Sequence, residues 1–173
     1  MLFYKCEKIT DTDEHEGAKK LLFELLEEHL PKIGKSAALC HRENGAPYLM
    51  LEEKEAEGIF ISLSHSHGMC AAVISDTPVG IDVEAVRDMG ESASRIEGRF
   101  LSKYGLDRCN ATDAASTTRF FYKWTYAEAS YKALGKSITK AERENRCDVS
   151  YFHKEMVDDA AKRTYVLCVL KTK

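Results

Sequence analysis

Residues 79–84 read VGIDVE, and this alternation of apolar and polar side chains indicates the fold class. Successive side chains of a β-strand point to opposite faces, so the three apolar residues are predicted to face a core while Asp82 and Glu84 share the other face. The two acidic positions then lie about 6.6 Å apart along the strand. Their oxygens can converge on one hard cation such as Mg²⁺. Taken alone, such a pair of acids is as often part of a solvated strand face as it is part of a metal site.

The segments on either side of this strand predict an α+β fold with antiparallel sheets. Apolar residues recur with a period of two in the expected strands and with helical spacing in the expected helices. The expected strands cover residues 2–9, 37–51 with a break at 44–47, 58–63, 69–74, 147–153 and 164–170. The expected helices run from Asp13 to a stop at Pro31, over residues 92–104, and over residues 119–134, the last after a polar loop that ends at Thr118.

The helix predicted over residues 119–134 carries a second group of chemically useful side chains. Its apolar positions, expected to face inward, are Phe120, Trp124, Ala127, Tyr131 and Leu134, and Gly135 is placed to end it. Glu128 and Lys132 follow Trp124 at intervals of four, so an acid that can accept a proton lies one turn from an ammonium that can hold a phosphate. On its own this spacing more often marks an ordinary surface pair.

Residues 62–68, SLSHSHG, concentrate hydroxyl and imidazole groups at the predicted end of a strand. Such groups suit the binding of phosphate oxygens. The alternative without a ligand is a polar turn. A third possibility is a zinc site built from His65, His67 and Cys70, although a fourth ligand at a fixed spacing is missing.

The composition is that of a globular protein without a strong overall charge. The 173 residues are 44% apolar and 31% charged, with a net charge of -3 and a pI near 6.1. Nothing here favours a nucleic-acid partner, and no stretch approaches the ~20 apolar residues of a membrane span, so neither partner is expected. The six cysteines are scattered and the first ten residues lack the layout of a signal peptide, which predicts free thiols and a cytoplasmic location.

Five segments, taken together and in this order, resemble the surfactin-synthetase-activating (Sfp-like) phosphopantetheinyl transferases. They are GAPYL (45–49), LSHS (63–66), VGIDVE (79–84), RFLS (99–102) and WTYAEASYKALGK (124–136). Each segment is weak alone, whereas the ordered set is specific. The resemblance implies one domain of two similar α+β halves, about residues 1–76 and 77–173, around a pseudo-twofold axis, with coenzyme A in the cleft between them.

The same resemblance implies a Mg²⁺-dependent transfer of the 4'-phosphopantetheine group of coenzyme A to a serine of an acidic acyl or peptidyl carrier protein. The implied metal ligands are Asp82, Glu84 and Glu128. The implied catalytic residues are Glu128, Lys132 and His65. The implied cofactor-binding residues are Ser64, His65, Arg42, Lys132 and Lys136. These roles suit the chemistry, because a breaking diphosphate needs a cation and the attacking hydroxyl needs a nearby base.

Three departures from the family pattern leave a second hypothesis open. Ala46 and Ala127 stand where relatives usually carry lysines, and Gly105 falls where some relatives place a further acid. A degenerate relative that binds coenzyme A or a carrier protein without catalysis is therefore the alternative to the transferase.

A basic patch is expected to dock the acidic carrier protein. It consists of Arg95, Arg99, Lys103 and Arg108. An ordinary surface helix, with Glu91 and Glu97 intermixed, explains the same charges equally well.

Overall fold

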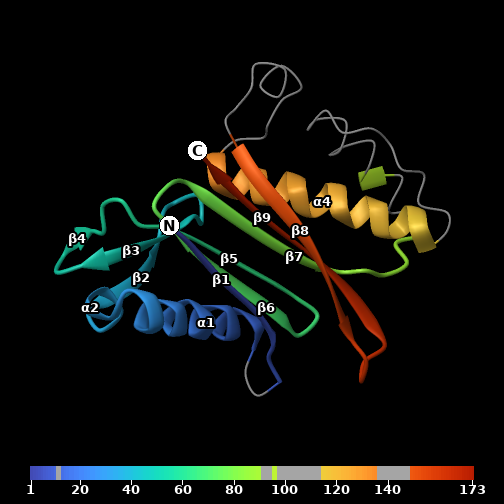
Figure 1. The fold of residues 1–173 in the computed structure, drawn as a ribbon, viewed down its shortest axis with the longest axis horizontal. Helices are drawn as coiled ribbons and strands as arrows, with labels where there is room; N and C mark the ends of the chain where they lie inside the picture. Colours follow the sequence, from blue (N-terminus) through green and yellow to red (C-terminus); the bar gives the residue numbers. More distant parts are fainter. Residues whose placement is uncertain (11–12, 91–94, 97–113, 136–148) are drawn as a thin grey trace.

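The computed structural model describes residues 1–10, 13–90, 95–96, 114–135 and 149–173, and it confirms the predicted α+β class (Figure 1). The elements are β1 (Leu2–Lys8), α1 (Glu14–His29), α2 (Pro31–Gly34), β2 (Ala37–His41), β3 (Pro47–Leu51), β4 (Lys54–Glu55), β5 (Phe60–Ser66), β6 (Met69–Ser75), β7 (Val79–Ala85), α4 (Ala114–Leu134), β8 (Val149–Asp158) and β9 (Arg163–Thr172). No helix in the described part of the chain is both long and apolar enough to cross a membrane.

The two larger sheets repeat one pattern of connections. The first has the order β1-β6-β5 and the second the order β7-β9-β8, and all pairings within them are antiparallel. In each unit the first strand pairs with the last, the last pairs with the one before it, and a helix follows the first strand. A smaller sheet, β2-β3-β4, is inserted between α2 and β5.

The sheets and helices are arranged in layers, and each layer buries the apolar face that its sequence pattern predicts. Leu21, Leu22, Leu25 and Leu26 of α1 pack on one face of the first sheet, where each buried leucine contributes roughly 2 kcal/mol. The other face of that sheet packs against the second sheet. The far side of the second sheet is covered by α4, so α1 and α4 lie on the outside of the two sheets (Figure 1).

The residues at both ends of α1 explain where the helix begins and ends. The carboxylate of Asp13 accepts hydrogen bonds from the amides of His15 and Glu16 at 3.0 and 3.1 Å, as a helix N-cap does. The helix ends at His29, and Pro31 then begins the short helix α2, because proline is tolerated in the first turn of a helix. The predicted stop at Pro31 is therefore the start of a second helical turn.

Three serine hydroxyls, called here the serine ladder, join the edge strands β5 and β7 of the two sheets. The amides of Ile81, Val83 and Ala85 donate to the hydroxyl oxygens of Ser62, Ser64 and Ser66 at 3.2, 3.2 and 3.3 Å. The constant offset of 19 residues means that the two strands run parallel. The polar-turn interpretation of residues 62–68 was wrong for the serines, because β5 continues to Ser66.

Other boundaries also differ from the prediction. Helix α4 begins at Ala114 rather than residue 119, so residues 114–118 belong to the helix rather than to the predicted loop. Tyr131, expected to face inward, is 47% exposed, while Ala129, Ser130 and Ala133 continue the buried side of the helix. Strands β8 and β9 are longer than predicted. Of the helix expected over residues 92–104, only residues 95–96 lie within the described part of the chain, and they are helical.

Gly80 allows α4 to approach β7 closely. A Cβ at this position would lie 2.9 Å from the amide nitrogen of Ala133 and closer still to the carbonyl oxygen of Ala129. Both neighbours are backbone atoms, so a side chain could be accommodated only if the helix moved. The distance between β7 and α4 therefore depends on the absence of a side chain at residue 80.

Replacing Gly80 with alanine tests this constraint. We expect Gly80→Ala to lower the free energy of unfolding by about 2 kcal/mol or more, because the helix must shift away from the strand. Gly58→Ala is the control, since Gly58 has open space around it and a φ of 71°, where alanine costs about 1 kcal/mol through backbone strain alone. Urea unfolding would measure both values, and equal losses would contradict the close-approach argument.

Candidate functional site

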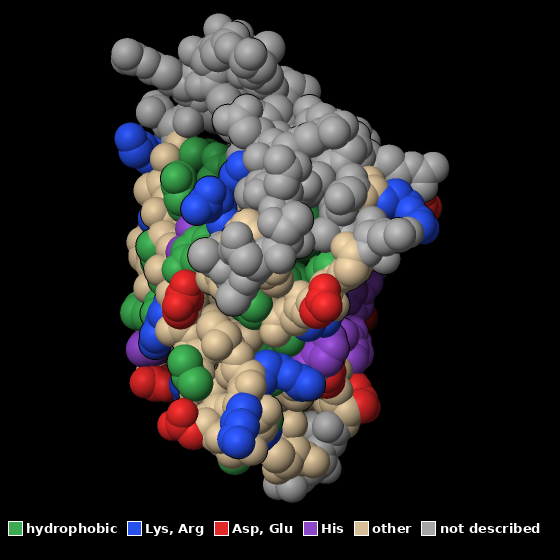
Figure 2. All heavy atoms as spheres, turned by 90° about the vertical axis from the view of Figure 1, so that its right-hand side faces the viewer, with side chains coloured by type: hydrophobic (Ala, Val, Ile, Leu, Met, Phe, Trp, Pro, Cys, Tyr) green, Lys and Arg blue, Asp and Glu red, His purple; other side chains and the backbone are tan. Residues whose placement is uncertain are grey.

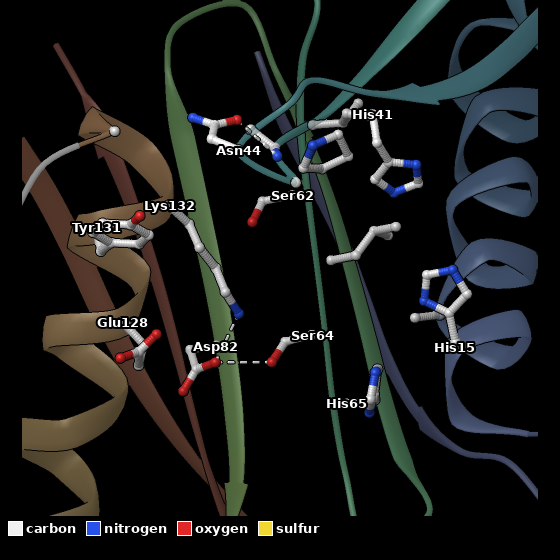
Figure 3. Close-up of a pocket in the computed structure, with 17 residues that line it drawn as sticks. His15, His41, Asn44, Ser62, Ser64, His65, Asp82, Glu128, Tyr131 and Lys132 are labelled. Atoms are coloured by element: carbon white, nitrogen blue, oxygen red, sulfur yellow. Dashed lines mark hydrogen bonds and ion pairs between the residues drawn. The ribbon is translucent and has the colours of Figure 1, made fainter.

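A cavity of about 490 Å³ is lined by side chains from both repeated units (Figure 3). Five predicted site residues meet on its walls. These are Ser64 and His65 from β5, Asp82 from β7, and Glu128 and Lys132 from α4. The core contacts of β7 confirm the two predicted faces, since Val79, Ile81 and Val83 belong to the core between the sheets. The opposite face is not solvated as a whole, because Asp82 is buried as well.

Asp82 is the most buried charge of the cavity, with 5% of its surface exposed. Its Oδ1 accepts hydrogen bonds from the Lys132 ammonium and from the Ser64 hydroxyl, each at 2.8 Å. Lys132 also donates to the carbonyl oxygen of Ile81 at 3.0 Å. Burial raises the pKa of Asp82 above its usual range, and the charge of Lys132 opposes that shift. The second oxygen, Oδ2, is buried and has no hydrogen-bond partner among the described residues.

Glu128 faces the same cavity from α4, one helical turn before Lys132 (Figure 3). Burial raises the pKa of Glu128, and the negative charge of Asp82 raises it further, while Lys132 acts in the opposite direction. A carboxylate with a raised pKa is a better proton acceptor than an exposed glutamate. The local environment therefore suits Glu128 to general-base chemistry.

Glu84 is held in the same manner as Asp82 but closer to solvent. Its Oε2 accepts hydrogen bonds from the Ser66 hydroxyl at 2.9 Å and from the Arg87 guanidinium at 2.8 Å. Arg87 also donates to the carbonyl oxygen of Ala85 and lies over the ring of Phe121. One oxygen of each acid is thus held by a serine and a basic side chain.

The acidic residues suit a hard cation better than zinc. Among the residues that the structure describes, no three His, Cys, Asp or Glu side chains form a ready-made metal centre. This holds for His65, His67 and Cys70 and equally for the three predicted metal ligands Asp82, Glu84 and Glu128. A structural zinc site needs three or four protein ligands, so His65, His67 and Cys70 receive no support as zinc ligands. Mg²⁺ is usually held by one or two carboxylates together with substrate phosphates and water. The buried, unpartnered Oδ2 of Asp82 and the nearby charge of Glu128 fit that requirement.

Histidines form one wall of the cavity, and two of them were not predicted. His65 is hydrogen-bonded through Nδ1 to the Glu14 carboxylate at 3.0 Å. The ring of His15 lies between two other imidazoles, with its centroid 6.4 Å from that of His65 and 6.1 Å from that of His41. His15 and His41 lie on α1 and β2 without any motif around them, so only the fold brings them to the cavity. Histidines also gather beside acidic and basic side chains on the face drawn in Figure 2.

Among the described residues, two predicted site residues, Glu84 and Arg42, are not brought into the cavity. Arg42 does not line it, but pairs with Glu55 and lies over the ring of Tyr48. Ala46 does line it, at the position where relatives usually carry a lysine. Lys136 and Gly105, together with Arg99, Lys103 and Arg108 of the expected docking patch, lie outside the described residues. The four described cysteines, Cys6, Cys40, Cys70 and Cys168, are free thiols as predicted.

The family model for the 4'-phosphopantetheinyl transferase superfamily matches residues 78–169, which is more than half of the chain. The chain therefore belongs to the 4'-phosphopantetheinyl transferase superfamily. The matched residues include Asp82, Glu84, Glu128 and Lys132.

One relative supports the same assignment. The 4'-phosphopantetheinyl transferase HetI of Nostoc sp. (strain PCC 7120 / SAG 25.82 / UTEX 2576) is 33% identical over 105 residues, which cover 59% of this chain and 43% of that protein. The match thus spans less than half of the relative's length. The predicted relation to the phosphopantetheinyl transferases is confirmed, while the narrower Sfp-like assignment stays a prediction.

The ion pair between Lys132 and Asp82 makes a prediction about stability and pH. Removing the ammonium in Lys132→Met raises the pKa of Asp82 further, since Lys132 is the group that lowers it. When the pKa of a carboxyl group is raised by folding, the protein loses stability as the pH rises from the ordinary pKa of 3.8 through the raised pKa of the folded state. We expect Lys132→Met to lower the free energy of unfolding by about 3 kcal/mol near pH 7, where Asp82 must stay charged without its partner or take up a proton. Near pH 4 the decrease should be much smaller.

Urea unfolding of both proteins at the two pH values measures this effect. Lys20→Met is the control, because its pair with Glu24 on α1 is long, at 3.9 Å, and exposed, so its removal is expected to change stability by less than about 0.5 kcal/mol at either pH. A loss for Lys132→Met that does not depend on pH would contradict the assignment of an uncompensated charge at Asp82.

Proposed function

We propose that this protein transfers the 4'-phosphopantetheine group of coenzyme A to the serine hydroxyl of an apo acyl or peptidyl carrier protein, with release of adenosine 3',5'-bisphosphate. The observation that carries the proposal is the convergence of Asp82, Glu128 and Lys132 on one cavity in a chain of this superfamily. The proposed type of enzyme is a holo-[acyl-carrier-protein] synthase, and its proposed location is the cytoplasm.

The proposed metal is Mg²⁺, held by Asp82, Glu84 and Glu128 together with the diphosphate of coenzyme A. When bound there, it would offset the charge that develops as the diphosphate breaks. The support is the set of hard oxygen donors in the cavity, one of them the unpartnered Oδ2 of Asp82. In addition to burial, Asp82 and Glu84 raise the pKa of Glu128 although Lys132 and Arg87 pair with them, so a further cation would also stabilise the three carboxylates.

Four side chains of the protein are proposed to act on the serine hydroxyl and on the phosphates of coenzyme A. Glu128, with its raised pKa, would accept the proton of the attacking serine. Lys132 would donate hydrogen bonds to the transferred phosphate, which requires it to leave Asp82 in part. His65 is half exposed on the opposite wall and would contact the phosphates of coenzyme A. Lys136 would assist if its side chain reaches the same cavity.

Intact-mass spectrometry of an apo carrier protein, incubated with this protein, coenzyme A and Mg²⁺, tests the transfer. A mass gain of one phosphopantetheine is expected. Glu128→Gln is expected to slow the reaction by about 10²–10⁴-fold, the usual contribution of a general base. Glu27→Gln, an exposed acid on α1 outside the cavity, is the matched control and should react at the rate of the unchanged protein.

A second candidate, a module that binds coenzyme A or a carrier protein without catalysis, rests on Ala46. This residue lines the cavity without a charge, and the cationic side chain of Arg42 is paired with Glu55 outside the lining. The mass experiment separates the two functions. Binding of coenzyme A without any mass gain on several carriers would favour the module over the enzyme.

The partner is proposed to be an acidic carrier protein that docks on the basic patch of Arg95, Arg99, Lys103 and Arg108. Arg95 is exposed, which allows such a contact. Reversing the charge in Arg95→Glu with Arg99→Glu is expected to weaken carrier binding at least tenfold and to reduce its salt dependence, because steering between opposite charges is screened by salt. Fluorescence anisotropy with a labelled carrier would measure this, and unchanged affinity would exclude the patch.

A further inference from the structure

The serine ladder has a regular relation to two predicted metal ligands, Asp82, which lines the cavity, and Glu84, which does not. Each serine oxygen accepts the amide that lies 19 residues later, and the side chain 18 residues later lies beside the same hydroxyl. For Ser64 and Ser66 that neighbour is Asp82 and Glu84, respectively. For Ser62 it is Gly80, which has no side chain. Two members of the ladder therefore carry an acid and one does not.

A hydroxyl group has one hydrogen to donate as well as lone pairs to accept with. In the ladder the oxygen accepts from β7, so the hydrogen is available for a second partner. Ser64 donates it to Oδ1 of Asp82 at 2.8 Å, and Ser66 donates it to Oε2 of Glu84 at 2.9 Å. The hydroxyl hydrogen of Ser64 is thus already donated to Asp82, whereas the family resemblance implies that Ser64 binds the cofactor.

Among the described residues, the hydrogen bonds to each acid converge on one of its two oxygens. Oδ1 of Asp82 receives Ser64 and Lys132, while Oε2 of Glu84 receives Ser66 and Arg87. Two donors on one oxygen set the orientation of the whole carboxyl group, and with it the direction of the second oxygen. In Asp82 that second oxygen is buried without a hydrogen-bond partner among the described residues (Figure 3).

From this geometry we infer that Ser64 and Ser66 are positioning residues, each of which orients one acid of the site, while Ser62 only joins the two strands. The functional consequence rests on the proposed function, since the oriented oxygens are those proposed to hold Mg²⁺. Hydrogen-bond partners of metal ligands typically change metal affinity by 10–100-fold when they are removed. The ladder therefore links the contact between the two units to the affinity of the site.

Calorimetric titration of Mg²⁺ into three alanine variants tests this inference without a measurement of activity. Ser64→Ala and Ser66→Ala are each expected to weaken Mg²⁺ binding by about tenfold. Ser62→Ala loses an equivalent interstrand hydrogen bond, at the same 3.2 Å as that of Ser64. Ser62 hydrogen-bonds to no acid in the described part of the chain, so the Mg²⁺ affinity of Ser62→Ala should stay within about twofold of that of the unchanged protein. An equal effect in all three variants would overturn the inference, as would no effect in Ser64→Ala and Ser66→Ala.

A double-mutant cycle decides the inference even if the proposed Mg²⁺ site is wrong. The unfolding equilibrium constants of Ser66→Ala, Glu84→Ala and the double variant are measured in EDTA. The two changes are expected to be coupled by about fivefold or more, whereas Ser62→Ala with Glu84→Ala should show coupling below about twofold. Absence of coupling between Ser66 and Glu84 would overturn the positioning role. Coupling without any Mg²⁺ binding by the unchanged protein would support that role and reject the metal part of the proposed function.

Discussion

The parallel contact between β5 and β7 is the constraint on which the rest of the structure depends. Each of these strands is an edge of its own sheet, and edge amides need partners. Serine hydroxyls supply three of them, at alternate residues that all point to the same side of β5. Because the hydroxyls replace backbone carbonyls, the two units meet through side chains. The cavity opens along this contact, with walls from both units.

The chemistry of the cavity follows from a balance of burial and charge. Asp82 is taken out of water, which is costly for a carboxylate, and the cost is offset by Lys132 and Ser64 on a single oxygen. The other oxygen has no partner among the described residues, and Glu128 lies close enough for its pKa to be raised by the same charge. An arrangement selected for stability alone would have satisfied both oxygens or replaced the acid by an apolar residue. The unpaired oxygen of Asp82 supports the proposal of a cation at this site.

The sequence predicted features that depend on local patterns, but not those that depend on contacts between distant elements. Alternation in residues 79–84 was sufficient to predict the two faces of β7, and the intervals of four between Glu128 and Lys132 were sufficient to place both on one side of α4. These patterns are local, so they survive in the fold. His15 and His41 reach the cavity only because distant elements meet there, and no local pattern marks them. The start of α4 was missed because its first turn is made of small and hydroxyl-bearing residues that also suit loops.

The same reasoning explains why the serine ladder could not be predicted from its own segment. Residues 62, 64 and 66 share one face of a strand, but serines at alternate positions fit a solvated face as well as a strand contact. What distinguishes the two is the partner strand, where positions 80, 82 and 84 carry no side chain, a short acid and a longer acid. The first must be glycine because α4 lies against it, and the next two place their carboxylates beside the ladder hydroxyls. Strand contact, helix approach and acid orientation therefore involve six alternating positions on two strands. Gly80 permits the approach of α4, the three serines join the strands, and Ser64 and Ser66 also hold Asp82 and Glu84.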